Sequence, residues 1–257
     1  MSLLSRAVAV AAVISASDPA LAHQDYAGDV HPRVAVENGQ FAIYFTNNRD
    51  RSAYKMVVST TGAVVSPRRA LGKATQDGGS PVRRQHAGRS YTFPAWEREH
   101  NGKPFYLVAE GKGAARRVEL PWPARTVNIV HDALVSDREI VLLATPDLQL
   151  FRFARGGGGF AKHRLGEPYR IYDFPRASNL AVHRDTVVVC WIDKAQRLLA
   201  SDWAPARGKS KTVVLAPKTD WNTTLAIGVI GDVLLLAYHG PGSKGAEIKT
   251  LLRRLPL

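Results

Sequence analysis

Four stretches of the chain repeat one pattern of apolar and polar residues. They are VAVENGQFAIYF (34–45), ALVSDREIVLLA (133–144), LAVHRDTVVVCW (180–191) and IGVIGDVLLLAY (227–238). Each contains a short apolar strand, a polar turn of two or three residues and a second apolar strand. The last two intervals between them are about 47 residues and the first is about twice as long. A weaker copy, VRRQHAGRSYTF (82–93), falls within that first interval.

A repeat of roughly 45 to 50 residues, with further short strands after each pair, is typical of a β-propeller, a ring of four-stranded sheets. The segments expected to supply the third and fourth strands are 53–59 and 63–71, 104–110 and 115–120, 148–154 and 160–165, and 197–203 and 211–216. Only one strand, 246–255, follows the fifth pair. We expect residues 23–30 to lie beside it and close the ring, because an open array would expose its sheet edges.

The predicted fold is therefore all-β, a propeller of five blades with four antiparallel strands each, closed by an N-terminal strand. Six shorter blades are the alternative, because the second unit is irregular around residues 94–100. The second strands contain VLLA, VVVCW and VLLLAY, which are nearly continuous apolar runs. Such runs predict strands that are buried on both faces.

The first residues match a secretory signal peptide. Arg6 precedes an apolar run from Ala7 to Ala16, and Ala20-Leu21-Ala22 fits a cleavage site. The run is too short to span a bilayer as a helix. We expect residues 1–22 to be removed, residues 23–257 to form one domain, and the protein to be periplasmic or secreted, with no transmembrane segment. A buried N-terminal helix is the alternative.

The chain contains one cysteine, Cys190, which cannot form an internal disulfide. Its apolar neighbours predict a buried, unreactive thiol, because burial disfavours the thiolate. The sequence also has no paired-cysteine or HExxH motif. We therefore expect no cofactor and no metal. One alternative is a copper site in which a mature N-terminal His23 chelates with a second histidine.

The formal net charge is +13. Basic residues recur on the predicted outermost strands, at 68–69, 116–117, 162–164, 209–211 and 253–254. Charges there protect exposed edges against aggregation. The alternative is a basic belt that binds polyanions. Stacking aromatics do not alternate with these cations, so specific nucleic-acid binding is not expected, although charge alone predicts weak, salt-sensitive binding.

Acids, amides and aromatics concentrate instead in the loops that enter the first strands and the loops that join second to third strands. We call the end of the propeller that these loops form the loop face. The candidate ligand-binding residues on it are Asp29, His31, Asn47, Asp50, Trp96, Asp173, Arg176, Asp220, Trp221 and His239. Aromatic faces together with carboxylates and amides suit a sugar, whereas Arg176 could hold a carboxylate or sulfate. The alternative is that Asp and Asn serve turns for backbone reasons.

The stretch Gly28-Asp29-Val30-His31-Pro32 resembles the start of the first inner strand in five-bladed glycosidases of the furanosidase type. In that family a catalytic Asp stands directly before the Pro. Here His31 occupies that position and Asp29 is displaced by two residues. Glycoside hydrolysis normally requires two carboxylates, and Glu167 is the only Glu in the loops that open the last three units.

The sequence therefore favours an exported, non-catalytic binding or scaffold protein that holds a glycan or an envelope protein on the loop face. The alternative is a carbohydrate-active hydrolase that uses carboxylates on the same face.

Overall fold

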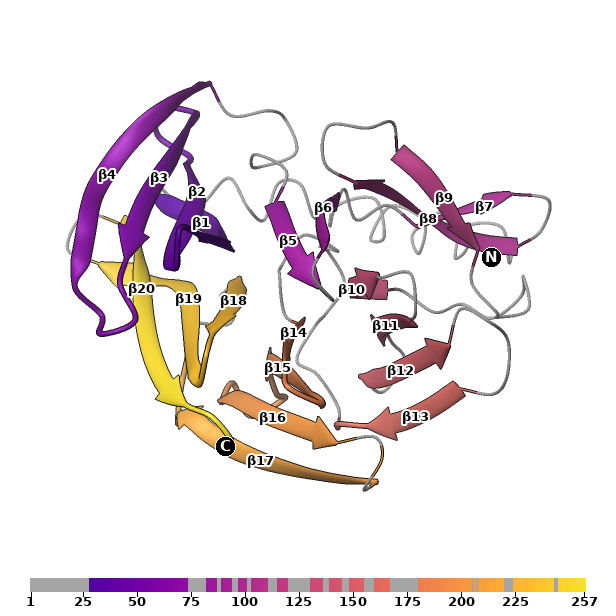
Figure 1. Ribbon diagram of the computed structural model, residues 1–257. Helices are drawn as coiled ribbons and strands as arrows, with labels where there is room; N and C mark the ends of the chain where they lie inside the picture. Colours follow the sequence, from indigo (N-terminus) through magenta and orange to yellow (C-terminus); the bar gives the residue numbers. More distant parts are fainter. Residues whose placement is uncertain are drawn as a thin grey trace, which may run out of the picture.

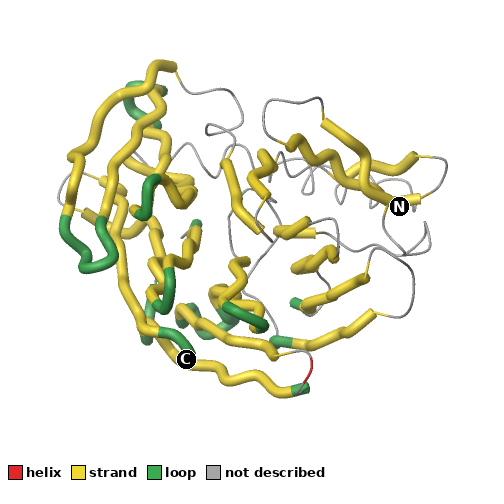
Figure 2. The backbone as a smooth tube through the Cα atoms, viewed as in Figure 1, coloured by secondary structure: helices red, strands yellow, loops and turns green. Residues whose placement is uncertain are grey.

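A computed structural model describes the chain at residues 28–73, 82–86, 89–93, 97–100, 103–110, 115–119, 130–135, 139–144, 148–154, 160–166, 180–204, 206, 208–219, 224–242 and 245–257. The described backbone is mostly strand, joined by short turns (Figure 2). It forms five antiparallel sheets arranged as a ring (Figure 1). The predicted signal peptide and its cleavage point lie outside the described residues. Within them, no helix is long and apolar enough to cross a membrane.

Three of the five sheets, or blades, have four strands in chain order. Blade 1 consists of β1 (Asp29–Glu37), β2 (Gln40–Asn47), β3 (Ser52–Val58) and β4 (Val64–Lys73). Blade 3 consists of β10 (Val130–Val135), β11 (Glu139–Ala144), β12 (Gln149–Ala154) and β13 (Phe160–Arg164). Blade 4 consists of β14 (Leu180–His183), β15 (Thr186–Ile192), β16 (Leu198–Ala204) and β17 (Lys209–Ala216). In each, the first strand is innermost and the fourth outermost (Figure 1).

Blade 2 is interrupted rather than divided into two blades. It consists of β5 (Val82–His86), β6 (Arg89–Phe93), β7 (Glu97–His100), β8 (Lys103–Glu110) and β9 (Ala115–Glu119). Ala109 of β8 pairs with β6 on one edge and with β9 on the other, and Phe105 pairs with β7 and with β9 in the same way. The strands β6 and β7 therefore follow one another along one edge of β8 as a broken second strand. The ring has five blades, and the six-blade alternative is wrong.

Blade 5 has three strands, β18 (Leu225–Ile230), β19 (Val233–Gly242) and β20 (Gly245–Arg254). The chain closes the ring where Gly28, directly before β1, forms a parallel bridge with Ala246 of β20. A Cβ atom on Gly28 would lie 2.2 Å from the Ala246 carbonyl oxygen, and the φ angle of Gly28 is +130°. Glycine is therefore required at this closure. Residues 23–27, the rest of the predicted closing strand, lie outside the described residues.

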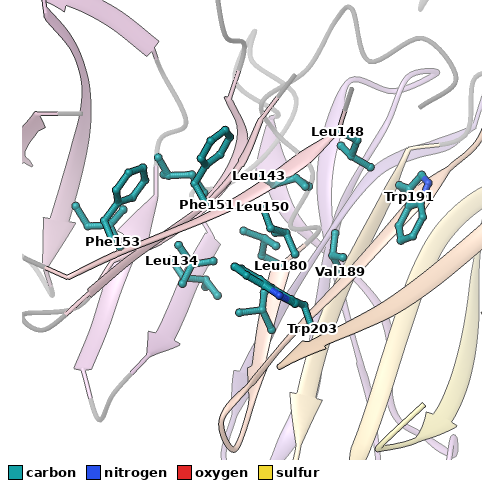
Figure 3. Packing of buried hydrophobic residues seen from close by; sticks show 14 of the residues in the cluster. Leu134, Leu143, Leu148, Leu150, Phe151, Phe153, Leu180, Val189, Trp191 and Trp203 are labelled. Atoms are coloured by element: carbon teal, nitrogen blue, oxygen red, sulfur yellow. The ribbon is translucent and has the colours of Figure 1, made fainter. Parts of the chain in front are cut away.

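The core lies between the blades, as the apolar runs predict. Alternate residues of β15 face opposite neighbours, since Val187, Val189 and Trp191 pack in a cluster with blade 3, whereas Val188 and Cys190 pack in a cluster with blade 5. Trp203 of β16 joins the first cluster, beside Leu180 and Val189 (Figure 3). Burial raises the pKa of the Cys190 thiol far above its usual range. The prediction of an unreactive thiol agrees with this environment.

The interface between blade 5 and blade 1 also contains a cluster of buried apolar residues. Phe41, Ile43 and Phe45 of β2 pack against Leu235 and Ala237 of β19. The same face of blade 1 carries Tyr54 and Met56 of β3. The polar residues described next lie at the loop-face end of this interface.

Candidate functional site

The structure describes five of the ten predicted site residues. Asp29 begins β1, Asn47 ends β2, Asp50 lies in the turn that follows, and His239 lies in β19, while His31 follows Asp29 along β1. All five belong to blades 1 and 5, where the ring closes. The others lie outside the described residues; they are Trp96, Asp173, Arg176, Asp220 and Trp221. We also expect Asp173, Arg176, Asp220 and Trp221 to converge with His239 in an axial pocket, and this stays a prediction.

Asp29 and Asn47 form the centre of this group. They are register partners across β1 and β2, and Asn47 Nδ2 donates to Asp29 Oδ1 at 2.7 Å. Asn47 Oδ1 in turn accepts the backbone N–H of Arg49 at 2.9 Å. Asn47 therefore has a turn-forming role, as the alternative interpretation expects, but its amide donor is directed at a buried carboxyl. Asp29 is only 9% exposed.

The second partner of Asp29 is Arg68, which sequence reasoning placed in the basic belt. Arg68 lies on the outermost strand, yet its Nη1 is 2.8 Å from Asp29 Oδ2 on the innermost strand. Its guanidinium lies 3.7 Å from the centre of the Tyr54 ring and 5.6 Å from that of Phe45. The side chain thus runs inward across β3 and β2. Most of the other cations predicted on the outer strands are exposed where the structure describes their side chains. These are Arg69, Lys162, Arg164, Lys211, Arg253 and Arg254.

The surroundings of the Asp29 carboxyl raise its pKa. Burial raises the pKa of Asp29 above its ordinary value of 3.8, and the negative charges of Asp50 and Glu247 raise it further. The hydrogen bond from Asn47 and the charge of Arg68 oppose this rise without cancelling it. Glu247 comes close because the Gly28–Ala246 bridge is parallel, which aligns the next residues on the two strands. The site therefore combines one buried carboxyl with two others nearby.

The raised pKa of Asp29 predicts a definite pH dependence of stability. Just above pH 3.8 the unfolded chain has lost the Asp29 proton that the folded protein still holds, so stability from this group falls as pH rises through that window. Asp29→Asn removes the titration and keeps one oxygen, which can accept from Asn47 or from Arg68 but not from both, because these two groups bind different oxygens of Asp29. Urea unfolding of both proteins between about pH 4 and pH 7 should show wild type losing stability relative to the variant as pH rises. The raised pKa would be contradicted if the stability of wild type relative to the variant stayed constant or rose with pH.

Asp50 lies in the exposed turn between β2 and β3. Tyr54 donates its hydroxyl to Asp50 Oδ2 at 2.5 Å, and the backbone N–H of Ser52 donates to Oδ1 at 2.9 Å. The Tyr54 hydroxyl is the main cause of the lowered pKa of Asp50. Asp50 therefore stays a carboxylate and holds Tyr54, whose ring supports Arg68.

His31 and His239 meet through a residue that the sequence did not indicate, Thr224. The backbone N–H of His31 donates to Thr224 Oγ1 at 3.2 Å, and Thr224 Oγ1 lies 2.8 Å from His239 Nδ1. His239 Nδ1 also accepts the Thr224 N–H at 3.1 Å. His31 has a φ of +55° and lies at a β-bulge between Val30 and Arg33. In the sequence, Pro32 directly after His31 was the available signal for irregular backbone. No signal pointed to Thr224 as the partner of His31.

Within the described ranges, no three His, Cys, Asp or Glu side chains are grouped closely enough to hold a metal ion. His23, the predicted first residue after cleavage, lies outside those ranges. The copper alternative therefore gains no support from the described residues.

No protein-family model matches the chain, and no curated protein matches it. Solved structures that are similar include a GH43_1 enzyme from Xanthomonas citri, with 18% identity over 92% of this chain and 93% of that one and a TM-score of 0.48. Another is CoXyl43, a β-xylosidase/α-arabinofuranosidase from a compost metagenome, with 13% identity over 88% and 91% and a TM-score of 0.47. A third is an α-L-arabinofuranosidase from Podospora anserina, with 12% identity over 88% and 91% and a TM-score of 0.44.

These similar structures are glycoside hydrolases by name, and this finding contradicts the prediction of a non-catalytic binding or scaffold protein. Identities this low concern the fold alone. The fold is established by the five sheets of the structure and their arrangement around a ring. The chain is a five-bladed β-propeller.

Proposed function

We propose that the protein is a carbohydrate-active hydrolase in which Asp29 is the proton donor to the leaving group. The observation that carries the proposal is the buried Asp29 carboxyl with its raised pKa, at the end of the interface between blades 1 and 5. General acids in glycosidases are carboxyls that burial keeps protonated toward neutral pH. Asn47 and Arg68 hold both oxygens of Asp29 in fixed directions.

A second carboxylate is needed to activate water or to attack the sugar. Two acids are candidates because both act on Asp29 through their charge, namely Asp50 in the β2–β3 turn and Glu247 on β20. Asp50 has a lowered pKa and stays ionised where Asp29 holds its proton. Glu247 is exposed and lies across the ring closure from Asp29. The buried surroundings of Asp29 suit a proton donor, and the exposed, hydrogen-bonded surroundings of Asp50 suit a base.

The segment that resembles five-bladed glycosidases also supports this proposal. Asp29 is displaced by two residues from the position directly before Pro32. The β-bulge between Val30 and Arg33 adds one residue to β1 relative to β2, since Val30 pairs with Thr46 but Arg33 pairs with Tyr44. The bulge therefore takes up part of that displacement.

The test is hydrolysis of a panel of aryl pentosides and hexosides. Asp29→Asn is expected to lower kcat/KM by at least about 100-fold on methylumbelliferyl glycosides, because general acid catalysis contributes at least that much. The loss should be much smaller on dinitrophenyl glycosides, whose leaving group departs without a proton. Asp50→Asn and Glu247→Gln then identify the second carboxylate, which is needed with both leaving groups.

The matched control is Asp185→Asn, since Asp185 is an exposed aspartate in the β14–β15 turn at the opposite end of the propeller. It is expected to leave turnover unchanged. The proposal fails if wild type hydrolyses none of the glycosides, or if Asp29→Asn retains wild-type turnover on every one.

A further inference from the structure

Arg68 comes from the rim of blade 1 but ends at the candidate site. It belongs to the outermost strand, β4, whose residues are otherwise almost all exposed. Its side chain is 39% exposed, whereas the Asp29 side chain that it contacts is 12% exposed. One end of the residue therefore faces solvent and the other reaches a buried carboxyl.

A β-bulge gives Arg68 this direction. Lys55 of β3 pairs with Arg69, but Val57 pairs with Ser66, so β4 carries one extra residue around Pro67 and Arg68. At a bulge, side chains no longer alternate regularly between the two faces of the sheet, and a proline can be accommodated within the strand. Arg68 thereby shares a face with Tyr54 and Phe45.

Two stacked rings support the guanidinium. The rings of Phe45 and Tyr54 are 5.8 Å apart with an angle of 15° between their planes. Arg68 lies over Tyr54 at 3.7 Å, and the Tyr54 hydroxyl is bonded to Asp50. A planar guanidinium stacks on such a surface in one orientation, which an ammonium does not.

The charged and polar groups that face Asp29 come from four places. Asn47 of β2 and Arg68 of β4 donate to it, while Asp50 of the β2–β3 turn and Glu247 of β20 act through negative charge. Among the described groups that act on Asp29, the positive charge comes from Arg68. Losing it would leave Asp29 beside two carboxylates with the Asn47 amide as its remaining named donor.

We propose that Arg68 is a positioning residue, whose guanidinium is held on Tyr54 and fixes the Asp29 carboxyl in the direction needed for proton transfer. This inference rests on the proposed role of Asp29. It gives Arg68 two separable functions. The charge limits the rise of the Asp29 pKa, and the planar stacked group sets the direction of the carboxyl.

The variants Arg68→Met and Arg68→Lys separate these functions, with Arg69→Met as the control that removes a neighbouring exposed arginine of the same strand. Carboxyl ¹³C NMR titration, assigned with Asp29→Asn, should show a higher Asp29 pKa in Arg68→Met and little change in the other two. The basic limb of the kcat/KM profile should move to higher pH in Arg68→Met alone. Both Arg68 variants should lower kcat about tenfold with KM nearly unchanged, because a misdirected group costs at least that much.

The outcomes distinguish the two proposals, and thermal unfolding confirms that each variant is folded. An unchanged Asp29 pKa and kcat in folded Arg68→Met overturns the role of Arg68. A shifted Asp29 pKa in Arg68→Met, together with full activity of Asp29→Asn, overturns the proposed function instead and leaves Arg68 acting on Asp29. A tenfold loss of kcat in Arg69→Met would show a general effect of charge on the strand and would also overturn the specific role.

Discussion

Replacing Gly28 with valine is expected to destabilise the propeller by roughly 3 kcal/mol or more, because it combines overpacking with backbone strain. The new Cβ atom would meet the Ala246 oxygen at 2.2 Å and the Ala246 nitrogen at 2.6 Å. Both are backbone atoms of β20, so the clash cannot be relieved by rotation of a side chain. The backbone pairing of Gly28 with Ala246 must therefore break, and Asp29 and Glu247 would no longer be aligned. Thermal unfolding should show a fall in Tm of roughly 10 °C.

Gly72→Val is the matched control. Gly72 has a φ of +119°, close to that of Gly28, but nothing lies within 4 Å of an added Cβ atom. Gly72→Val therefore introduces the same backbone strain as Gly28→Val but no steric clash of the new Cβ atom. An equal loss of stability in the two variants would mean that the ring closure contributes nothing beyond local backbone strain.

The sequence predicted the blades well because the information is local. The stretch 180–191 predicts two strands and a turn, and the structure has β14 at Leu180–His183 and β15 at Thr186–Ile192. Apolar runs, polar turns and a repeat of fixed length each determine a few consecutive residues. Radial packing then follows, because each sheet has two apolar faces to bury.

The candidate site was predicted only in part, because its contacts join distant residues. Asp29 and Asn47 were recognisable as polar residues at strand ends. Arg68 was not, since its inward direction depends on the bulge in β4 and on the Phe45–Tyr54 stack. Pro67 was the one available signal, because proline inside a strand indicates an edge or a bulge. Thr224 contacts His31 from 193 residues away, which no local pattern indicates.

The interface between blades 3 and 4 depends on Trp203, and Trp203→Ala is expected to lower the free energy of unfolding by about 3 to 5 kcal/mol. Trp203 is 2% exposed and packs in a cluster with residues of β12, β14 and β15 (Figure 3). Its ring also stacks on His163 of blade 3, with 5.5 Å between ring centres. The cavity would lie between two blades that meet through side chains, so the backbone can close it only by tilting one sheet against the other. Urea unfolding measures the loss.

Two further variants separate cavity formation from other effects. Trp203→Phe keeps an aromatic ring against His163 and should recover about half of the lost stability, since much of the buried apolar volume returns. Val65→Ala removes apolar volume from a side chain that is 50% exposed and should change stability by less than about 0.5 kcal/mol. If Trp203→Ala were as mild as Val65→Ala, the contacts between blades 3 and 4 would not determine stability. The ring would then depend chiefly on its other interfaces, including the closure at Gly28 beside the candidate site.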